Sequence, residues 1–158
     1  MLILGIDPGT AIVGYGLIEK QGQKLIPVCY SCWRTKSDMP MTERLLIIYE
    51  SLDNFLRKSP PDVMAVEELF FNRNTTTALT VGQARGVILL AAAKNNIEVF
   101  EYTPLQVKQA VVGYGKADKQ QVQFMVRALL ALKETPKPDD TADALAVAIC
   151  HAHSVRRT

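Results

Sequence analysis

The stretch that decides the fold is LILGIDPGTAIVGYGLIEKQGQKLIPVCYSCWRT, residues 2–35. Residues 2–6 form an apolar run of strand length that ends at the turn residues Asp7-Pro8-Gly9-Thr10. A second run, residues 12–19, leads to a Gln-Gly-Gln turn, and a third extends over residues 24–35. Because short turns join the three predicted strands, they are expected to be neighbours in an antiparallel meander.

Beyond residue 35 the hydrophobic period changes from two residues to that of a helix. Apolar residues at 45, 48, 52 and 55 predict a helix that ends before Pro60-Pro61. Residues 63–66 predict a buried strand and residues 98–102 a fifth strand, with a long helix over residues 75–94 between them, capped by Asn74 or Thr75. Thr103-Pro104 begins another helix, Asp118 begins one that runs to about residue 132, and residues 141–153 form the last. The sequence therefore predicts an α/β fold with a mixed five-stranded sheet flanked by helices, in one domain over residues 1–158.

The composition is that of a globular protein. The chain has 158 residues, 48% of them hydrophobic and 22% charged, which argues against disorder. No apolar run approaches the ~18 residues that cross a bilayer, and no basic leader precedes the first strand. We therefore expect no signal peptide and a cytoplasmic location. The net charge of +2 neither demands nor excludes a polyanionic partner.

Cys29 and Cys32 have the CxxC spacing of zinc or redox sites. They lie in a predicted strand, where an offset of three places the two thiols on opposite faces. With Cys150, His151 and His153 a ligand set can be assembled on paper, but a second CxxC or an HxxxH is missing. We expect packing cysteines.

Four acidic residues stand where solubility explains them poorly. Asp7 and Glu67 each follow a predicted buried strand, and Asp140 and Asp143 are three residues apart, on one face at the start of the last helix. Strand ends beside crossover helices are common ligand sites. Each acid also has an ordinary structural explanation: a turn residue for Asp7, a solvated strand end for Glu67 or Glu68, an N-cap for Asp140, and a first-turn acid for Asp143.

If the four carboxylates converge, they need a cation, because like charges at close range raise one another's pKa. Oxygen-only ligation suits Mg²⁺ or Mn²⁺. Two such ions about 4 Å apart are a standard arrangement for hydrolysing a phosphodiester. The residues alone therefore make metal-dependent phosphodiester hydrolysis a hypothesis.

The chain resembles the RuvC family of Holliday junction resolvases along nearly its whole length. The matching segments are LGIDPGT (4–10) with GYG (14–16), AVEELFFNRN (65–74), GQARG (82–86), EY (101–102), QVKQ (106–109), VVGYGKADK (111–119) and DTADALAVA (140–148). The resemblance implies an RNase H-like fold and a catalytic, metal-binding tetrad of Asp7, Glu67, Asp140 and Asp143. It selects Glu67 over Glu68, which strand phase alone leaves undecided.

The resemblance also implies a function and its partners. It implies an endonuclease of recombination and repair that makes paired symmetric nicks in four-way junctions, with two Mg²⁺ per active site (Mn²⁺ substituting) and 5′-phosphate and 3′-hydroxyl products. Lys108 and Lys119 match lysines implicated in DNA contact and catalysis, and Phe70 matches an aromatic that stacks on unpaired bases. A RuvA and RuvB branch-migration complex is the implied partner.

Affinity for DNA is expected to come from phosphate contacts, and so to fall with salt. The candidate residues for these contacts are Arg73, Arg85, Lys108, Lys116, Lys119 and the terminal Arg156 and Arg157. Two symmetric cuts require two symmetric active sites, which favours a C2 homodimer. We expect residues 75–94 to supply much of its interface through Gly82, Ala84, Gly86 and the alanines at 91–93, unless this face packs only on its own sheet.

Three alternatives remain open at this point. A DxGT turn after a first strand also binds phosphate in actin-like ATPases, but those proteins need a second similar domain. The chain could be a non-catalytic junction-binding module of the same fold, or an RNase H-like nuclease acting on other branched or hybrid substrates.

Overall fold

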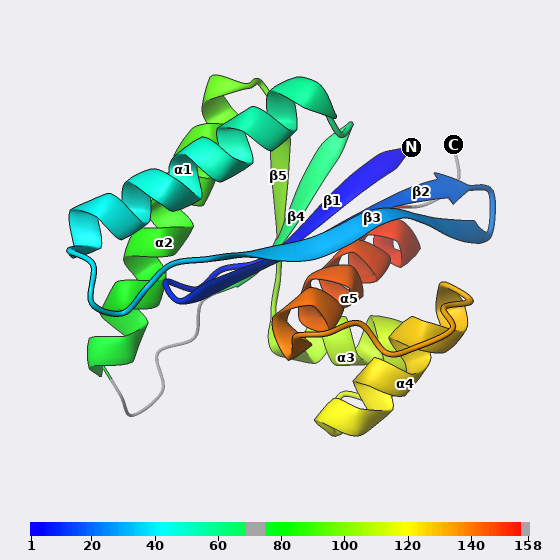
Figure 1. Cartoon of the computed structure of the whole chain (residues 1–158). Helices are drawn as coiled ribbons and strands as arrows, with labels where there is room; N and C mark the ends of the chain where they lie inside the picture. Colours follow the sequence, from blue (N-terminus) through cyan, green and yellow to red (C-terminus); the bar gives the residue numbers. More distant parts are fainter. Residues whose placement is uncertain (69–74, 156–158) are drawn as a thin grey trace.

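The structure is a computed structural model that describes residues 1–68 and 75–155. Its centre is a five-stranded sheet of order β3-β2-β1-β4-β5 (Figure 1). The meander β1 (Leu2–Asp7), β2 (Ile12–Gln21) and β3 (Lys24–Arg34) is antiparallel, whereas β4 (Val63–Glu67) and β5 (Glu98–Tyr102) continue the sheet in parallel with β1. The prediction of a mixed five-stranded sheet is confirmed.

Helices cover both faces of the sheet (Figure 1). One face carries α1 (Met41–Lys58) and α2 (Thr75–Lys94), which also contact each other. The other face carries α3 (Pro104–Val112), α4 (Lys119–Leu129) and α5 (Asp139–Ser154). Each helix layer encloses its own hydrophobic core, so the sheet is buried on both sides, as strands of a parallel sheet commonly are.

The alternation of the strands decides which helix layer each acid faces. Ile3 and Ala65 belong to the core beneath α3, α4 and α5, while the residues that follow each of them belong to the core beneath α1 and α2. Successive side chains of a strand point to opposite faces. Asp7, four residues after Ile3, and Glu67, two after Ala65, therefore fall on the α5 face at the same edge of the sheet.

Three glycines allow α5 to lie close against the sheet. A Cβ atom on Gly5 would stand 1.9 Å from the Ala144 carbonyl oxygen, and one on Gly14 would stand 2.0 Å from the Asp140 carbonyl oxygen. At Gly16 the same atom would meet the Leu145 side chain at 2.4 Å. A side chain at Gly5 or Gly14 would push the helix backbone away, whereas one at Gly16 would displace the Leu145 side chain. The glycines thus bring the N-terminal half of α5 against β2 and against β1, the strand that ends in Asp7.

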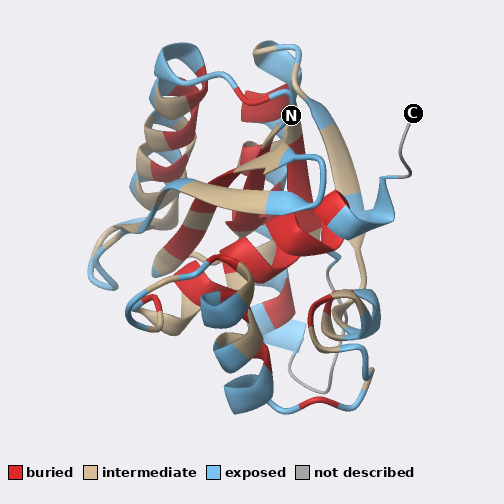
Figure 2. Ribbon diagram, turned by 90° about the vertical axis from the view of Figure 1, so that its right-hand side faces the viewer, coloured by how far each residue is buried: buried red, intermediate tan, exposed pale blue. Residues whose placement is uncertain are grey.

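The fifth helix is the most deeply buried helix of the described chain (Figure 2). From Thr141 to Ala152 every residue is buried except Asp143. Apart from His151 the buried side chains are small or apolar, and they supply seven of the sixteen buried residues of the core on this face. Asp143 is thus the position at which an otherwise enclosed helix reaches the surface.

Helix boundaries follow the predicted caps closely. Thr103 and Asp118 each form a capping box, with Gln106 and Gln121 respectively. The predicted helix to residue 132 ends earlier, at Leu129, because Ala131 adopts a φ of 50° that no right-handed helix allows. The alternative that Asp140 is an N-cap is wrong, since α5 begins at Asp139 with a proline at its N-cap. The possible cap Asn74 lies outside the described residues.

The three cysteines are free thiols, and two of them pack in or against a hydrophobic core. Cys29 packs against the core beneath α1 and α2, and Cys150 is buried in the core beneath α5. Of the helices described, α2 alone is long and apolar enough to cross a membrane by length and composition. Its buried residues include Arg85, and it packs against α1 and β5 as a core helix does.

Candidate active site

The four predicted acids come from three elements that meet at one edge of the sheet. Asp7 ends β1 and Glu67 ends β4, and these strands are parallel neighbours. Asp140 and Asp143 lie in the first turns of α5, directly over β1 and β2. Residues more than 130 positions apart in the chain therefore face a common region.

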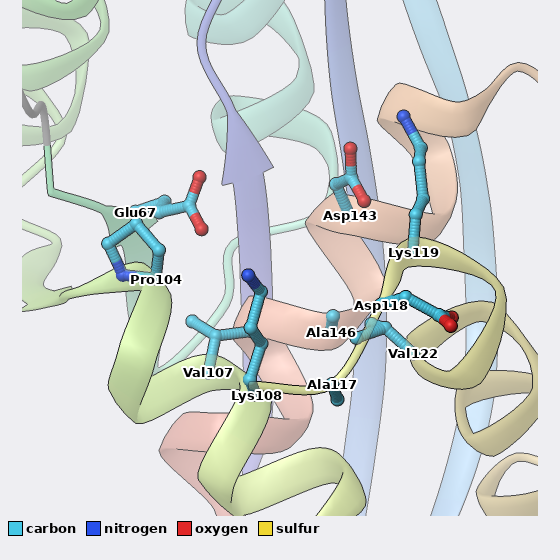
Figure 3. Close-up of a pocket in the computed structure, with 10 residues that line it drawn as sticks. All are labelled: Glu67, Pro104, Val107, Lys108, Ala117, Asp118, Lys119, Val122, Asp143 and Ala146. Carbon is cyan, nitrogen blue, oxygen red and sulfur yellow. The ribbon is translucent and has the colours of Figure 1, made fainter. Parts of the chain in front are cut away.

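A pocket of about 260 Å³ opens between these acids and the helices α3 and α4. Figure 3 shows the carboxylates of Glu67 and Asp143 pointing into it from different sides, with Lys108 projecting between them. Lys119, at the start of α4, also lines this pocket. A second cavity of about 250 Å³ is lined by Asp7, Glu67 and Arg85 among others. Glu67 belongs to both walls and so links the two hollows.

Burial and mutual repulsion change the acidity of Asp7. Burial raises its pKa to about 8, and the negative charges of Asp143, Asp140 and Glu67 act in the same direction, as does a hydrogen bond with Asp140. A carboxyl that is both desolvated and surrounded by acids keeps its proton at neutral pH unless a cation compensates the charge. Because the charges of all three other acids reach Asp7, the four carboxyl groups lie close together in the folded protein.

Burial and nearby lysines act in opposite directions on the pKa values of Glu67 and Asp143. Burial and Asp143 raise the pKa of Glu67, while the Lys108 ammonium lowers it. Burial raises the pKa of Asp143, and Lys119 acts against it. Each of these carboxylates therefore has its own lysine across the pocket. The lysines supply positive charge at the rim, where a phosphate could share it.

The donor chemistry fits a hard divalent cation, since all four side chains offer carboxylate oxygens. In residues 1–68 and 75–155, however, no three histidine, cysteine or acidic side chains are already arranged to hold an ion. The acids interact electrostatically but do not form a closed ligand cage.

The predicted DNA-contacting residues do not share one environment. Lys108 and Lys119 line the pocket, and Lys116 is exposed on the loop before α4. The side chain of Arg85 is instead 11% exposed, and its guanidinium is bonded inside the protein. Phe70, Arg73, Arg156 and Arg157 lie outside the described residues.

Asp139 escaped the sequence reasoning, and Arg85, which was predicted as a DNA contact, is bonded inside the protein instead. Asp139 forms ion pairs with Lys119 at 3.1 Å and with Lys137 at 3.7 Å. Arg85 bonds to the backbone of Glu67 and to the Glu101 carboxylate. The pairing of Lys119 with Asp139 spans twenty residues of chain and had no local signal. For Arg85, the sequence signal for burial was the position of a charged residue among the apolar residues of α2.

Comparison with known proteins agrees with this arrangement. The family model described as crossover junction endodeoxyribonuclease RuvC matches residues 3–151. A crossover junction endodeoxyribonuclease RuvC of Desulfitobacterium hafniense is 71% identical over 98% of this chain and 94% of its own length. The RuvC structure of T. thermophilus in complex with a Holliday junction substrate superposes with a TM-score of 0.92, at 40% identity, over 97% of this chain and 93% of that one.

A more distant structure shares the fold alone. The yeast mitochondrial Holliday junction resolvase superposes with a TM-score of 0.71 at 16% identity, covering 96% of this chain and 78% of its own. The RNase H-like architecture predicted above is thus confirmed. By its family-model match and by its identity to curated relatives, this chain belongs to the RuvC family of crossover junction endodeoxyribonucleases.

Proposed function

We propose that this chain resolves Holliday junctions by hydrolysing phosphodiester bonds in paired, symmetric nicks, leaving 5′-phosphate and 3′-hydroxyl ends, in recombination and DNA repair. The observation that carries the proposal is Asp7, whose pKa is raised to about 8 by burial and by three other acids at the ends of β4 and α5. A polar cluster of this kind costs stability and has no structural purpose without a cation. Family membership supplies the reaction class and the substrate class.

Members of this family are metal-dependent nucleases. We propose Mg²⁺ as the metal, with Mn²⁺ able to substitute, and two ions in each active site. Such ions would be held by Asp7, Glu67, Asp140 and Asp143, which we assign as the catalytic residues. When bound, they lower the pKa of the attacking water and stabilise the leaving 3′ oxygen.

The protein's own residues set the conditions for this chemistry. Asp7 must lose its proton before it can ligate, because burial keeps the carboxyl protonated at neutral pH. Glu67 and Asp143 approach from different sides of the pocket and can share a cation with Asp7 after side-chain rotation. Rigid strands and a buried helix hold all of these side chains, which limits the motion that the reacting groups must make.

Lys108 and Lys119 are the proposed contacts to the scissile phosphate. Both line the pocket that contains Glu67 and Asp143. Lys119 is 56% exposed, so its ammonium can turn from Asp139 to a phosphate oxygen. Lys116, Arg73 and Phe70 are proposed as further DNA contacts, the last by stacking on an unpaired base.

A homodimer is proposed through the outward face of α2. Leu79 and Leu90 are 64% and 59% exposed, and Gly86 stands between them with no atom within 4 Å of a Cβ position. These residues are spaced by seven and four, which places them on one helical stripe. Of the residues expected at the interface, Ala84 and the alanines at 91 and 92 pack inside their own domain instead. The glycine and the two leucines offer the close, apolar contact that a symmetric partner requires.

Three further properties are proposed from the family rather than from any single residue. The chain forms one nuclease domain over residues 1–158, acts in the cytoplasm, and works with a RuvA and RuvB branch-migration complex.

The decisive experiment is incubation with a synthetic four-way junction and Mg²⁺. Linear duplex, RNA–DNA hybrid and metal-free reactions serve as controls. Symmetric incision of the junction alone supports the proposal. Binding without incision would support a junction-binding module, and incision of the hybrid in preference to the junction would support a different RNase H-like nuclease.

A further inference from the structure

Arg85 lies in the middle of α2, on the side of the helix that faces the sheet. Its side chain is 11% exposed. Of the lysines and arginines in residues 1–68 and 75–155, it is the one that is buried. Because an enclosed guanidinium is costly unless its charge and donors are satisfied, its partners indicate its purpose.

The guanidinium bonds to the ends of two neighbouring strands. Nη1 donates to the backbone carbonyl oxygen of Glu67 at 2.5 Å, and Nη2 pairs with the Glu101 carboxylate at 2.5 Å. Glu67 ends β4, and Glu101 lies one residue before the end of the neighbouring β5, opposite Val66. Arg85 thus ties α2 to the edge of the sheet where the acids gather.

Together with one backbone hydrogen bond, the bond from Arg85 to Glu67 fixes the peptide group that joins Glu67 to Glu68. The carbonyl of the Glu67–Glu68 peptide accepts from Arg85, and the N–H of the same peptide donates to the Tyr102 carbonyl oxygen at 2.7 Å. A peptide plane held at both ends cannot rotate without breaking a bond. Its orientation sets the direction in which the Cα–Cβ bond of Glu67 leaves the strand. The carboxylate itself is not bonded by Arg85 and stays directed into the pocket.

We propose that Arg85 is a positioning residue that aims Glu67 at the reacting phosphate, and that it does not itself touch DNA. This inference rests on the proposed function, because Glu67 has to act in the reaction for its aim to matter. A direct phosphate contact would require the guanidinium to leave Glu67 and Glu101. The cavity that Arg85 lines also contains Asp7 and Glu67, so the anchor is adjacent to the acids it serves.

The test compares Arg85→Met, which keeps length and removes every donor, with Arg85→Lys, which keeps one cation but not the fork. Arg57→Met is the matched control, since Arg57 is also ion-paired, to Asp53, but lies on α1 away from the acids. Three quantities are measured for each protein: the junction dissociation constant at several salt concentrations without divalent metal, the single-turnover cleavage rate at saturating protein, and the hydrogen exchange of the Glu68 amide.

We expect Arg85→Met to lower the cleavage rate at saturation by roughly ten- to a hundredfold, as a misplacement of about 1 Å can do. Junction affinity should change by less than about twofold and its salt slope should stay the same, because no phosphate contact is lost. The Glu68 amide should exchange faster, and Arg85→Lys should recover part of the rate. Arg57→Met should leave all three quantities near their original values.

Opposite results would overturn the inference. Weaker binding with a shallower salt slope and an unchanged rate at saturation would make Arg85 a phosphate contact. An unchanged rate together with faster amide exchange would make it a purely structural anchor. If Arg85→Met does not fold, Arg85→Lys decides by the same measurements. Failure of the unsubstituted chain to cut the junction would overturn the proposed function itself, and is recognised in the wild-type reaction before any variant is compared.

Discussion

Substituting Asp7 with asparagine should abolish cleavage and, in metal-free buffer at neutral pH, make the protein more stable. The native carboxyl holds its proton up to about pH 8, whereas the unfolded carboxyl loses it near 3.8. Between these values the unfolded chain binds fewer protons, so stability falls as pH rises. Asparagine does not ionise and escapes this loss. It keeps nearly the same volume, which preserves packing beneath α5.

The size of the effect follows from the two pKa values. The interval between 3.8 and about pH 7.5, which lies below the native pKa of about 8, corresponds to an upper limit of about 5 kcal/mol. Water entering the adjacent cavities and side-chain relaxation reduce such values, so we expect roughly 2 kcal/mol. For a chain of this length that is a rise in melting temperature of about 4–8 °C.

The assay is thermal unfolding of both proteins with chelator at several pH values between about 4.5 and 8.5. The difference in melting temperature between Asp7→Asn and the wild type should be small at the acidic end and widen toward pH 8. Comparing this difference between pH values removes any pH-independent cost of the asparagine side chain. Mg²⁺ should then stabilise the wild type at pH 8 and have less effect on the variant. Asp53→Asn is a control of opposite sign, because hydrogen bonds from Arg57 and Asn95 lower the pKa of Asp53, and its loss should destabilise at neutral pH. A gap between Asp7→Asn and wild type that does not change with pH would refute the reasoning.

Three other substitutions test separate parts of the site. Lys119→Ala should slow cleavage and lower the salt slope of junction binding by about one, whereas Lys137→Ala, more exposed and outside the pocket, should lower the slope less and leave the rate unchanged. Gly14→Ala should cost about 3 kcal/mol or more in urea unfolding and reduce cleavage, because its Cβ meets helix backbone, while Gly16→Ala meets a side chain that can rotate and should cost less. Leu79→Glu should convert the dimer to monomers in a sedimentation experiment and lower the melting temperature by no more than a few degrees. If the sedimenting mass does not change, α2 is not part of the dimer interface.

The sequence was sufficient for the elements and their order, because period and capping are local properties. The bounds of α2 and β5 agree with the prediction to the residue, and Thr103 and Asp118 cap the helices expected of them. The mixed sheet and its antiparallel meander also followed from the short turns, whereas the position of β4 beside β1 was not predicted. The end of α4 did not follow, because a positive φ at an alanine has no sequence signal.

The choice between Glu67 and Glu68 shows where local reasoning stops. Both follow the same buried strand, and alternation alone says that they face opposite sides. Deciding which of them meets the other acids requires knowing which face carries α5, a tertiary fact. In the structure Ala65 packs beneath α5, so Glu67 shares that side. The resemblance to the family had selected the same residue on other grounds.

The anchor on Glu67 was unpredictable for a related reason. Arg85 sits eighteen residues from Glu67 in the chain, and an arginine beside two glycines suits a DNA-binding surface as well as a core contact. Its burial depends on how α2 lies against β4 and β5. Whether the charged group of an arginine is exposed or buried depends on tertiary packing, which cannot be read from the local sequence.

Since α5 is both the central core helix and the carrier of two of the acids, the active site has no independent hinge. Sub-global openings that displace Asp143 would also have to release the contacts of α5 with the sheet and with α3 and α4. Activity and fold should therefore be lost in a single step on heating, with no loosened but intact intermediate that still binds junctions and cannot cut. For the same reason, enlarging a buried alanine on the far side of this helix would shift Asp140 and Asp143 and lower the cleavage rate, although that alanine does not contact DNA.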